Sequence, residues 1–131
     1  MRLYLDTSAL VKLVVKEPES VPLQAFLDAS SDDSLFTAAL SRTELLRAVS
    51  RIGEIATAEA RALLDAVDTV ALTRSLLDNA GLLGPSHLRS LDAIHLAAAM
   101  RAGTELRSVI TYDVRMADAA ERLGMQTSAP R

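Results

Sequence analysis

The chain has no cysteine and no tryptophan, and its 131 residues include only two tyrosines and two phenylalanines. The absence of cysteine excludes disulfides, thiolate metal sites and cysteine nucleophiles, and it agrees with a reducing, cytoplasmic location. Because aromatic residues make up 3% of the chain, the bases of a nucleic acid have no aromatic platform on which to stack. Any contact with nucleic acid must therefore be electrostatic or mediated by a metal ion.

Long apolar runs are also missing. No stretch approaches the roughly 20 uncharged apolar residues of a membrane span, and Asp6 interrupts the first apolar run before an export signal could form. With 50% hydrophobic residues, the chain is expected to form a single domain over residues 1–131, its core filled by aliphatic side chains.

Lysine is scarce: among 14 basic residues only Lys12 and Lys16 are lysine, and the rest are arginine. The net charge of −3 argues mildly against a nucleic-acid partner. Arg42, Arg47 and Arg51 nevertheless crowd one helical stretch, and guanidinium groups suit bidentate contacts with phosphate. Solvated helix faces and a genome rich in arginine codons are the alternative explanations for these arginines.

What is present is an alternation of short apolar runs with helical periodicity. Strands are predicted at 3–5, 35–38, 69–72 and 108–111, with at most a short edge strand in 125–131. Helices are predicted from the Thr7-Ser8 pair onward and at 21–29, from Ser41 to Gly53, and at 56–67, 74–79, 90–102 and 114–123. Because no hairpin signals occur, this order predicts an α/β fold with a parallel sheet and helices on both faces.

The helix predicted at 90–102 has almost no polar face. A helix that is apolar all round must be covered on both sides. We expect one side to lie against the sheet and the other against a partner helix or a second subunit, and the Ala97-Ala98-Ala99 run would permit close approach.

Four acids stand near predicted helix starts: Asp6, Glu44, Asp92 and Asp113. Each has a local explanation. Asp6 and Asp113 suit N-caps, and Glu44 forms a capping box with Ser41. Asp92 complements the positive end of a helix that Ser90 is predicted to cap. Asp6 and Asp113, however, directly follow predicted strands, where parallel α/β sheets bind ligands and metals.

If these four carboxylates lie together, they raise one another's pKa values unless a cation is shared. The absence of cysteine favours all-oxygen ligation, which points to Mg²⁺ or Mn²⁺ rather than Zn²⁺. The two histidines, His87 and His95, lack a credible third metal-binding partner. His95 is predicted to be a buried, hydrogen-bonded histidine of the core or of an interface.

Four sequence motifs resemble those of the PIN domain, specifically the small VapC-type toxins of bacterial toxin–antitoxin pairs. They are L-D-T-S-A-L, R-T-E-L-L-R-A, L-D-A-I-H-L-A-A-A and T-Y-D-V-R-M-A, in that order along nearly the whole chain. The resemblance implies a three-layer α/β/α fold with a mostly parallel sheet of four to five strands. It also implies Mg²⁺-dependent endoribonuclease activity, a homodimer, and inhibition by a cognate VapB-type antitoxin.

By the same resemblance, the family's acidic quartet corresponds to Asp6, Glu44, Asp92 and Asp113. Thr7 or Ser8, and Thr111, correspond to its supporting hydroxyls. Asp118 lies about 140° round a helix from Asp113 and is left outside the set that binds the ion.

These assignments predict a mechanism in which Asp6 and Asp92 bind Mg²⁺ directly and Mn²⁺ can substitute for it. Asp113 is expected to bind the ion directly or through water. Glu44 orients a metal-bound water or binds a second ion. Attack by an activated water on RNA would leave a 5′-phosphate and a 3′-hydroxyl.

Two other functions compete with this one. An aspartyl-phosphate phosphatase of the haloacid-dehalogenase type needs a second Asp two residues after the first, where this chain has Ser8, and no lysine follows Lys16. A catalytically inactive PIN-like module that binds RNA or protein stays open, with the acids serving as helix caps.

Overall fold

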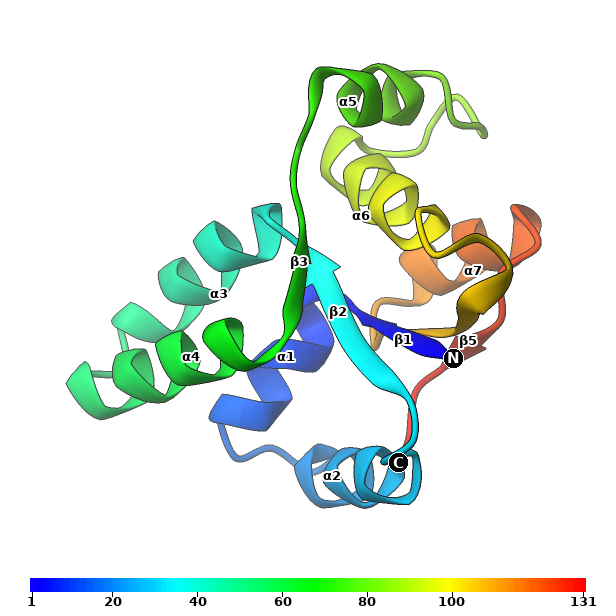
Figure 1. The fold of residues 1–131 in the computed structure, drawn as a ribbon. Helices are drawn as coiled ribbons and strands as arrows, with labels where there is room; N and C mark the ends of the chain where they lie inside the picture. Colours follow the sequence, from blue (N-terminus) through cyan, green and yellow to red (C-terminus); the bar gives the residue numbers. More distant parts are fainter.

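The computed structural model describes residues 1–131 and contains one five-stranded parallel sheet in the order β3-β2-β1-β4-β5 (Figure 1). The central strand β1 pairs with β2 on one side and with β4 on the other. The predicted parallel sheet is confirmed, including a short strand near the C-terminus. The strands are β1 (Arg2–Leu5), β2 (Ser34–Ala38), β3 (Asp68–Val70), β4 (Leu106–Ile110) and β5 (Thr127–Ser128).

Helices cover both faces of the sheet, so the predicted three-layer α/β/α arrangement is confirmed (Figure 1). One layer consists of α1 (Thr7–Val14), α2 (Ser20–Ala29), α3 (Leu40–Ser50) and α4 (Glu54–Ala66). The other consists of α5 (Arg74–Gly81), α6 (Ser90–Met100) and α7 (Val114–Arg122). A 3₁₀ turn, Gly103–Glu105, leads into β4. No helix is long and apolar enough to cross a membrane.

The alternation of side chains along β1 divides the core into two parts, because successive strand residues point to opposite faces. Leu3 and Leu5 pack against the α1–α4 layer. Tyr4 points to the other face, where its ring meets Phe36 edge-on with centroids 5.1 Å apart. Alanines of α6 complete this second core, and their small side chains allow the helix to lie close to the sheet.

Two predicted helix caps are wrong. Helix α3 begins at Leu40, and the hydroxyl of Ser41 is 2.6 Å from that of Thr37 on β2, so Ser41 and Glu44 form no capping box. The N-cap of α6 is Arg89, which makes no side-chain capping bond, and Ser90 is already helical. Glu44 is thus left without its predicted local role, whereas Asp92 does lie in the first turn of α6, where it complements the positive helix end.

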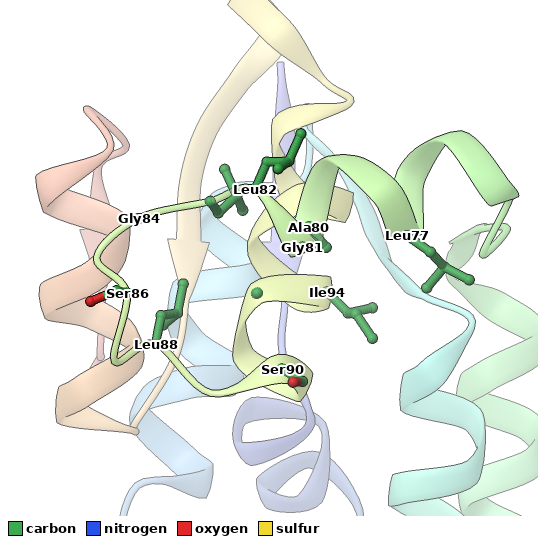
Figure 2. Close-up of a pocket in the computed structure, with 11 residues that line it drawn as sticks. Leu77, Ala80, Gly81, Leu82, Gly84, Ser86, Leu88, Ser90 and Ile94 are labelled. Atoms are coloured by element: carbon green, nitrogen blue, oxygen red, sulfur yellow. The ribbon is translucent and has the colours of Figure 1, made fainter.

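Helix α6 packs against the sheet and against α5, so a partner helix does cover part of its second side. Leu91 and Met100 remain about half exposed. A cavity of about 600 Å³ opens between α5, the 82–88 loop and α6 (Figure 2). Its lining is mostly apolar, and Leu82, at its edge, is 87% exposed.

Candidate active site

The candidate site lies at the point in the sheet where the direction of strand connection changes, between β1 and β4. The chain runs from β1 outward to β2 and β3 and then returns to the other side of β1 as β4. In open α/β sheets, ligands bind in the crevice beyond the carboxyl ends of the strands at such a switch point. Asp6 directly follows β1 and Thr111 directly follows β4. The Asp6 backbone N–H donates to the Ile110 carbonyl at 3.2 Å, which joins the two strand ends.

Asp6 is held in one orientation and is almost fully buried, with 3% exposure. Its Oδ1 accepts hydrogen bonds from the Ser8 hydroxyl at 2.6 Å and the Ala9 backbone at 3.1 Å. Its Oδ2 accepts one from the Thr111 hydroxyl at 2.5 Å. Burial raises the pKa of this carboxyl above its ordinary value, although these bonds favour the charged form. An ionised Asp6 is therefore costly unless a cation lies beside it.

Glu44 is brought to the same region by α3 and is fixed by the two neighbouring helices. Its Oε1 accepts from the Thr7 hydroxyl at 2.6 Å and lies 2.7 Å from Nε2 of His95. Burial acts to raise the pKa of Glu44, but these hydrogen bonds and the charge on His95 outweigh it and bring the pKa below its ordinary value. Glu44 is thus held as a carboxylate.

His95 is buried and hydrogen-bonded, as predicted. The partner that the sequence did not reveal is Glu44. On its other side, Nδ1 of His95 lies 2.6 Å from the Tyr4 hydroxyl. Burial and the charge on Asp6 raise the pKa of Tyr4 far above its ordinary value, so the phenol keeps its proton. Nε2 of His95 can donate to Glu44 in either state of the ring: in the neutral ring Tyr4 donates to Nδ1, and in the charged ring the Nδ1–H donates to the Tyr4 oxygen.

The sequence contained one indication that His95 belongs to the site. His95 follows Asp92 by three residues, and residues three apart lie on the same face of a helix. Any site that includes Asp92 therefore includes the neighbourhood of His95. The partner could not be read, because it comes from α3, fifty-one positions away along the chain.

Asp92 and Asp113 lie close enough to affect each other electrostatically. Burial raises the pKa of Asp92, the negative charge of Asp113 adds to the rise, and the positive charges of Arg89 and His95 oppose it. Asp113 caps α7, its Oδ1 accepting from the Arg115 backbone at 2.9 Å and from the Met116 backbone at 3.4 Å. Its predicted capping role is confirmed, and it leaves Oδ2 for another partner.

The oxygen donors of these acids suit a metal ion, but the acids do not converge on one point in this structure. No three acidic or histidine side chains stand close enough to hold one ion together. The donor set is nevertheless all oxygen, as Mg²⁺ prefers. A carboxylate accepts about four hydrogen bonds, so the three that Asp6 accepts leave one position open. Asp6, Asp92 and Asp113 are the residues that would hold an ion.

The three arginines predicted as phosphate contacts differ from one another in the structure. The guanidinium of Arg42 is not free, because it donates to the Leu64 carbonyl at 3.3 Å and to Asp65 at 3.2 Å. It connects α3 to α4. Arg47 and Arg51 are exposed and make no ion pair. Asp118 is also exposed and pairs with Arg122 at 2.9 Å.

Residues 3–122 match the family model of the PIN domain. Two relatives from Mycobacterium tuberculosis agree over almost the full length. Ribonuclease VapC47 is 44% identical, covering 98% of this chain and 96% of the relative, and Ribonuclease VapC46 is 46% identical, covering 98% and 97%. The chain belongs to the PIN-domain family. Within that family it belongs to the VapC group.

Solved structures of PIN-domain proteins share the fold. VapC20 of Mycobacterium tuberculosis, described as a Sarcin-Ricin loop cleaving toxin, has a TM-score of 0.74 and 20% identity, covering 89% of this chain and 94% of that one. A toxin–antitoxin complex from Klebsiella pneumoniae has a TM-score of 0.72 and 19% identity, covering 100% and 98%. These similarities establish the α/β PIN fold of the chain.

Proposed function

We propose that the chain is a metal-dependent endoribonuclease and the toxin component of a VapBC-type toxin–antitoxin pair. The observation that carries the proposal is the buried Asp6 at the switch point of the sheet. Burial raises the pKa of its carboxyl, and the hydroxyls of Ser8 and Thr111 fix its orientation. Such a group destabilises the metal-free fold and becomes favourable beside a cation. The names of the relatives, both ribonucleases, support RNA as the substrate.

The proposed ion is Mg²⁺, for which Mn²⁺ substitutes, and when bound it would polarise a phosphate and lower the pKa of a water. Asp6 and Asp92 would hold it directly, and Asp113 directly or through water. Asp6 keeps its orientation through Ser8 and Thr111. Glu44, kept charged by His95 and Thr7, would accept a hydrogen bond from the attacking water and align it. Cleavage would leave a 5′-phosphate and a 3′-hydroxyl.

The partner proposed beside RNA is an antitoxin, because solved structures with this fold include a toxin–antitoxin complex and VapBC assemblies. A second copy of the chain is the other proposed partner. The exposed side chains of Leu77 and Leu82 line the cavity between α5 and α6 (Figure 2), and Leu91 and Met100 are exposed elsewhere on α6. A two-fold dimer would bury this apolar surface.

The function is tested by incubating the protein with mixed cellular RNA in Mg²⁺, in Mn²⁺ and in chelator. We expect cleavage with either ion and none in chelator. Asp6→Asn should lose about 100-fold or more in rate, because the ion loses a direct ligand. Mg²⁺ should also raise the melting temperature of the parent protein and not that of Asp6→Asn.

The matched control is Asp28→Asn, which removes an acid from α2 whose side chain bonds only Gln24. It should cleave RNA and respond to Mg²⁺ as the parent does. A folded parent that binds RNA without cutting it in either ion would contradict the proposal and identify the chain as a binding module.

A further inference from the structure

A small cavity of about 120 Å³, lined mainly by polar and charged residues, lies beside Asp92 and has no role in the mechanism above. Its walls come from the loop before α6, from the first turn of α6 and from α7. It is lined by Pro85, His87, Leu88, Arg89, Asp92, Arg115, Asp118 and Ala119. The cavity therefore opens directly next to one of the proposed metal ligands.

Two arginines give this cavity a positive edge. Arg89 precedes α6 and Arg115 lies in the first turn of α7, so the guanidiniums come from two different elements. Neither makes an ion pair, although Arg2, Arg42, Arg107 and Arg122 each do. Two acids line the cavity: Asp118 is already paired with Arg122, and Asp92 is influenced by the charge of Arg89 without forming an ion pair with it. No ion pair therefore occupies the guanidinium of Arg89 or of Arg115.

The size and lining of the cavity select the kind of ligand. Pockets that enclose a drug-sized molecule have volumes of about 300–1,000 Å³, well above the 120 Å³ found here. The lining holds no phenylalanine, tyrosine or tryptophan, and its one ring is the imidazole of His87 beside two guanidiniums. Positive charge is therefore a larger part of this surface than ring area on which a base could stack. A phosphate group is small, and a guanidinium binds it through two parallel hydrogen bonds.

We propose that Arg89 and Arg115 bind a phosphodiester of single-stranded RNA next to the one that is cut. This inference rests on the proposed ribonuclease function. An acidic site repels the backbone of its own substrate, and the ion at the acids neutralises only the phosphate that reacts. Two unpaired guanidiniums beside Asp92 would offset the repulsion on the neighbouring phosphate and keep the strand in register with the acids.

The test compares Arg89→Gln and Arg115→Gln with the parent on a short RNA that the parent cuts. Each substitution should raise KM about tenfold, because the contact is the same in the ground state and in the transition state. The kcat of Arg115→Gln should stay within about threefold of the parent. Arg115→Lys, which keeps the charge but loses the planar fork, should have an intermediate KM.

Salt dependence provides an independent measure. With Asp6→Asn protein, which does not cut, the affinity for a labelled single-stranded RNA is followed as salt rises. Removing one phosphate contact should reduce the slope of log affinity against log salt by roughly 0.7. Arg61→Gln is the control, because Arg61 is an unpaired arginine on α4 beside a different cavity, and it should leave both KM and slope unchanged.

If the parent cuts RNA while Arg89→Gln and Arg115→Gln keep its KM and its salt slope, the inference is wrong and the proposed function stands. If these variants instead lose inhibition by the antitoxin with KM unchanged, the cavity binds an acidic group of the antitoxin, which also overturns the inference. If the folded parent cuts no RNA, the proposed function fails, and the salt slopes alone then decide whether the arginines bind phosphate.

Discussion

At the scale of single residues, the same carboxylate serves both the helix and the site. Asp6 caps α1 through the Ala9 backbone, and Asp113 caps α7 through the Arg115 backbone. A cap uses one oxygen of the carboxylate and leaves acceptor positions for another partner. A capping role is therefore no argument against a metal-binding role. Glu44 is different, because its partners Thr7 and His95 come from other helices and it caps nothing.

The lowered pKa of Glu44 predicts how stability depends on pH. A carboxyl whose pKa is lowered on folding stabilises the protein above its unfolded value, here 4.5, and loses this contribution as the pH falls through the lower folded value. Glu44→Gln should therefore melt at a lower temperature than the parent at neutral pH, and the gap should close in acid. Thermal melts from pH 7 downward measure this. A gap independent of pH would show that the Glu44 charge contributes nothing to stability.

At the scale of elements, the sequence located every strand and helix but not all of their ends. The apolar runs and their periods depend on local composition, so β1, α6 and the edge strand β5 could be read directly. The start of α3 could not. The Ala39 N–H, just before this helix, donates to the Val70 carbonyl at 2.8 Å, which is a contact with the distant strand β3. The Ser41 hydroxyl contacts nearby Thr37 on β2 and does not cap the helix.

The side-chain pairs of the site show the same limit. Asp6 and Asp113 could be named from their positions after strands, and Asp92 from the first turn of a helix. Glu44 was also predicted in a first turn, but α3 begins at Leu40 and places it beyond that turn. The Glu44–His95 contact could not be predicted, because it joins two helices. Arg42 was grouped with Arg47 and Arg51 as a candidate phosphate contact, but its guanidinium pairs with Asp65 on α4. Pairs between distant residues depend on the fold, so the local sequence pattern does not predict them.

The apolar surface between α5 and α6 predicts an assembly that one substitution should break. Leu82 is 87% exposed at the edge of the cavity, so Leu82→Glu costs the monomer little and would place a charge inside the proposed dimer interface. We expect the parent to elute as a dimer at micromolar concentration and Leu82→Glu as a folded monomer. Leu91 is the second position for the same test. A parent that remains monomeric would disprove this interface.

At the scale of the whole molecule, antitoxin and metal are expected to compete for the acids. A guanidinium inserted by the antitoxin would pair with the carboxylates and exclude the ion, so each ligand should weaken the other by an equal factor. The antitoxin's affinity should fall as Mg²⁺ rises at constant ionic strength. In Asp6→Asn this dependence should largely vanish, and in Asp28→Asn it should persist. Affinity indifferent to Mg²⁺ in the parent would mean that inhibition acts by covering the RNA path.

The central claim is that these acids direct a water, and not the ribose 2′-hydroxyl, at the phosphate. The most direct measurement is cleavage of RNA in ¹⁸O-labelled water with Mg²⁺, followed by mass spectrometry of the product ends. Attack by water requires one ¹⁸O atom in each new 5′-phosphate and a free 3′-hydroxyl on the other fragment. A 2′,3′-cyclic phosphate with an unlabelled 5′-hydroxyl would contradict the account.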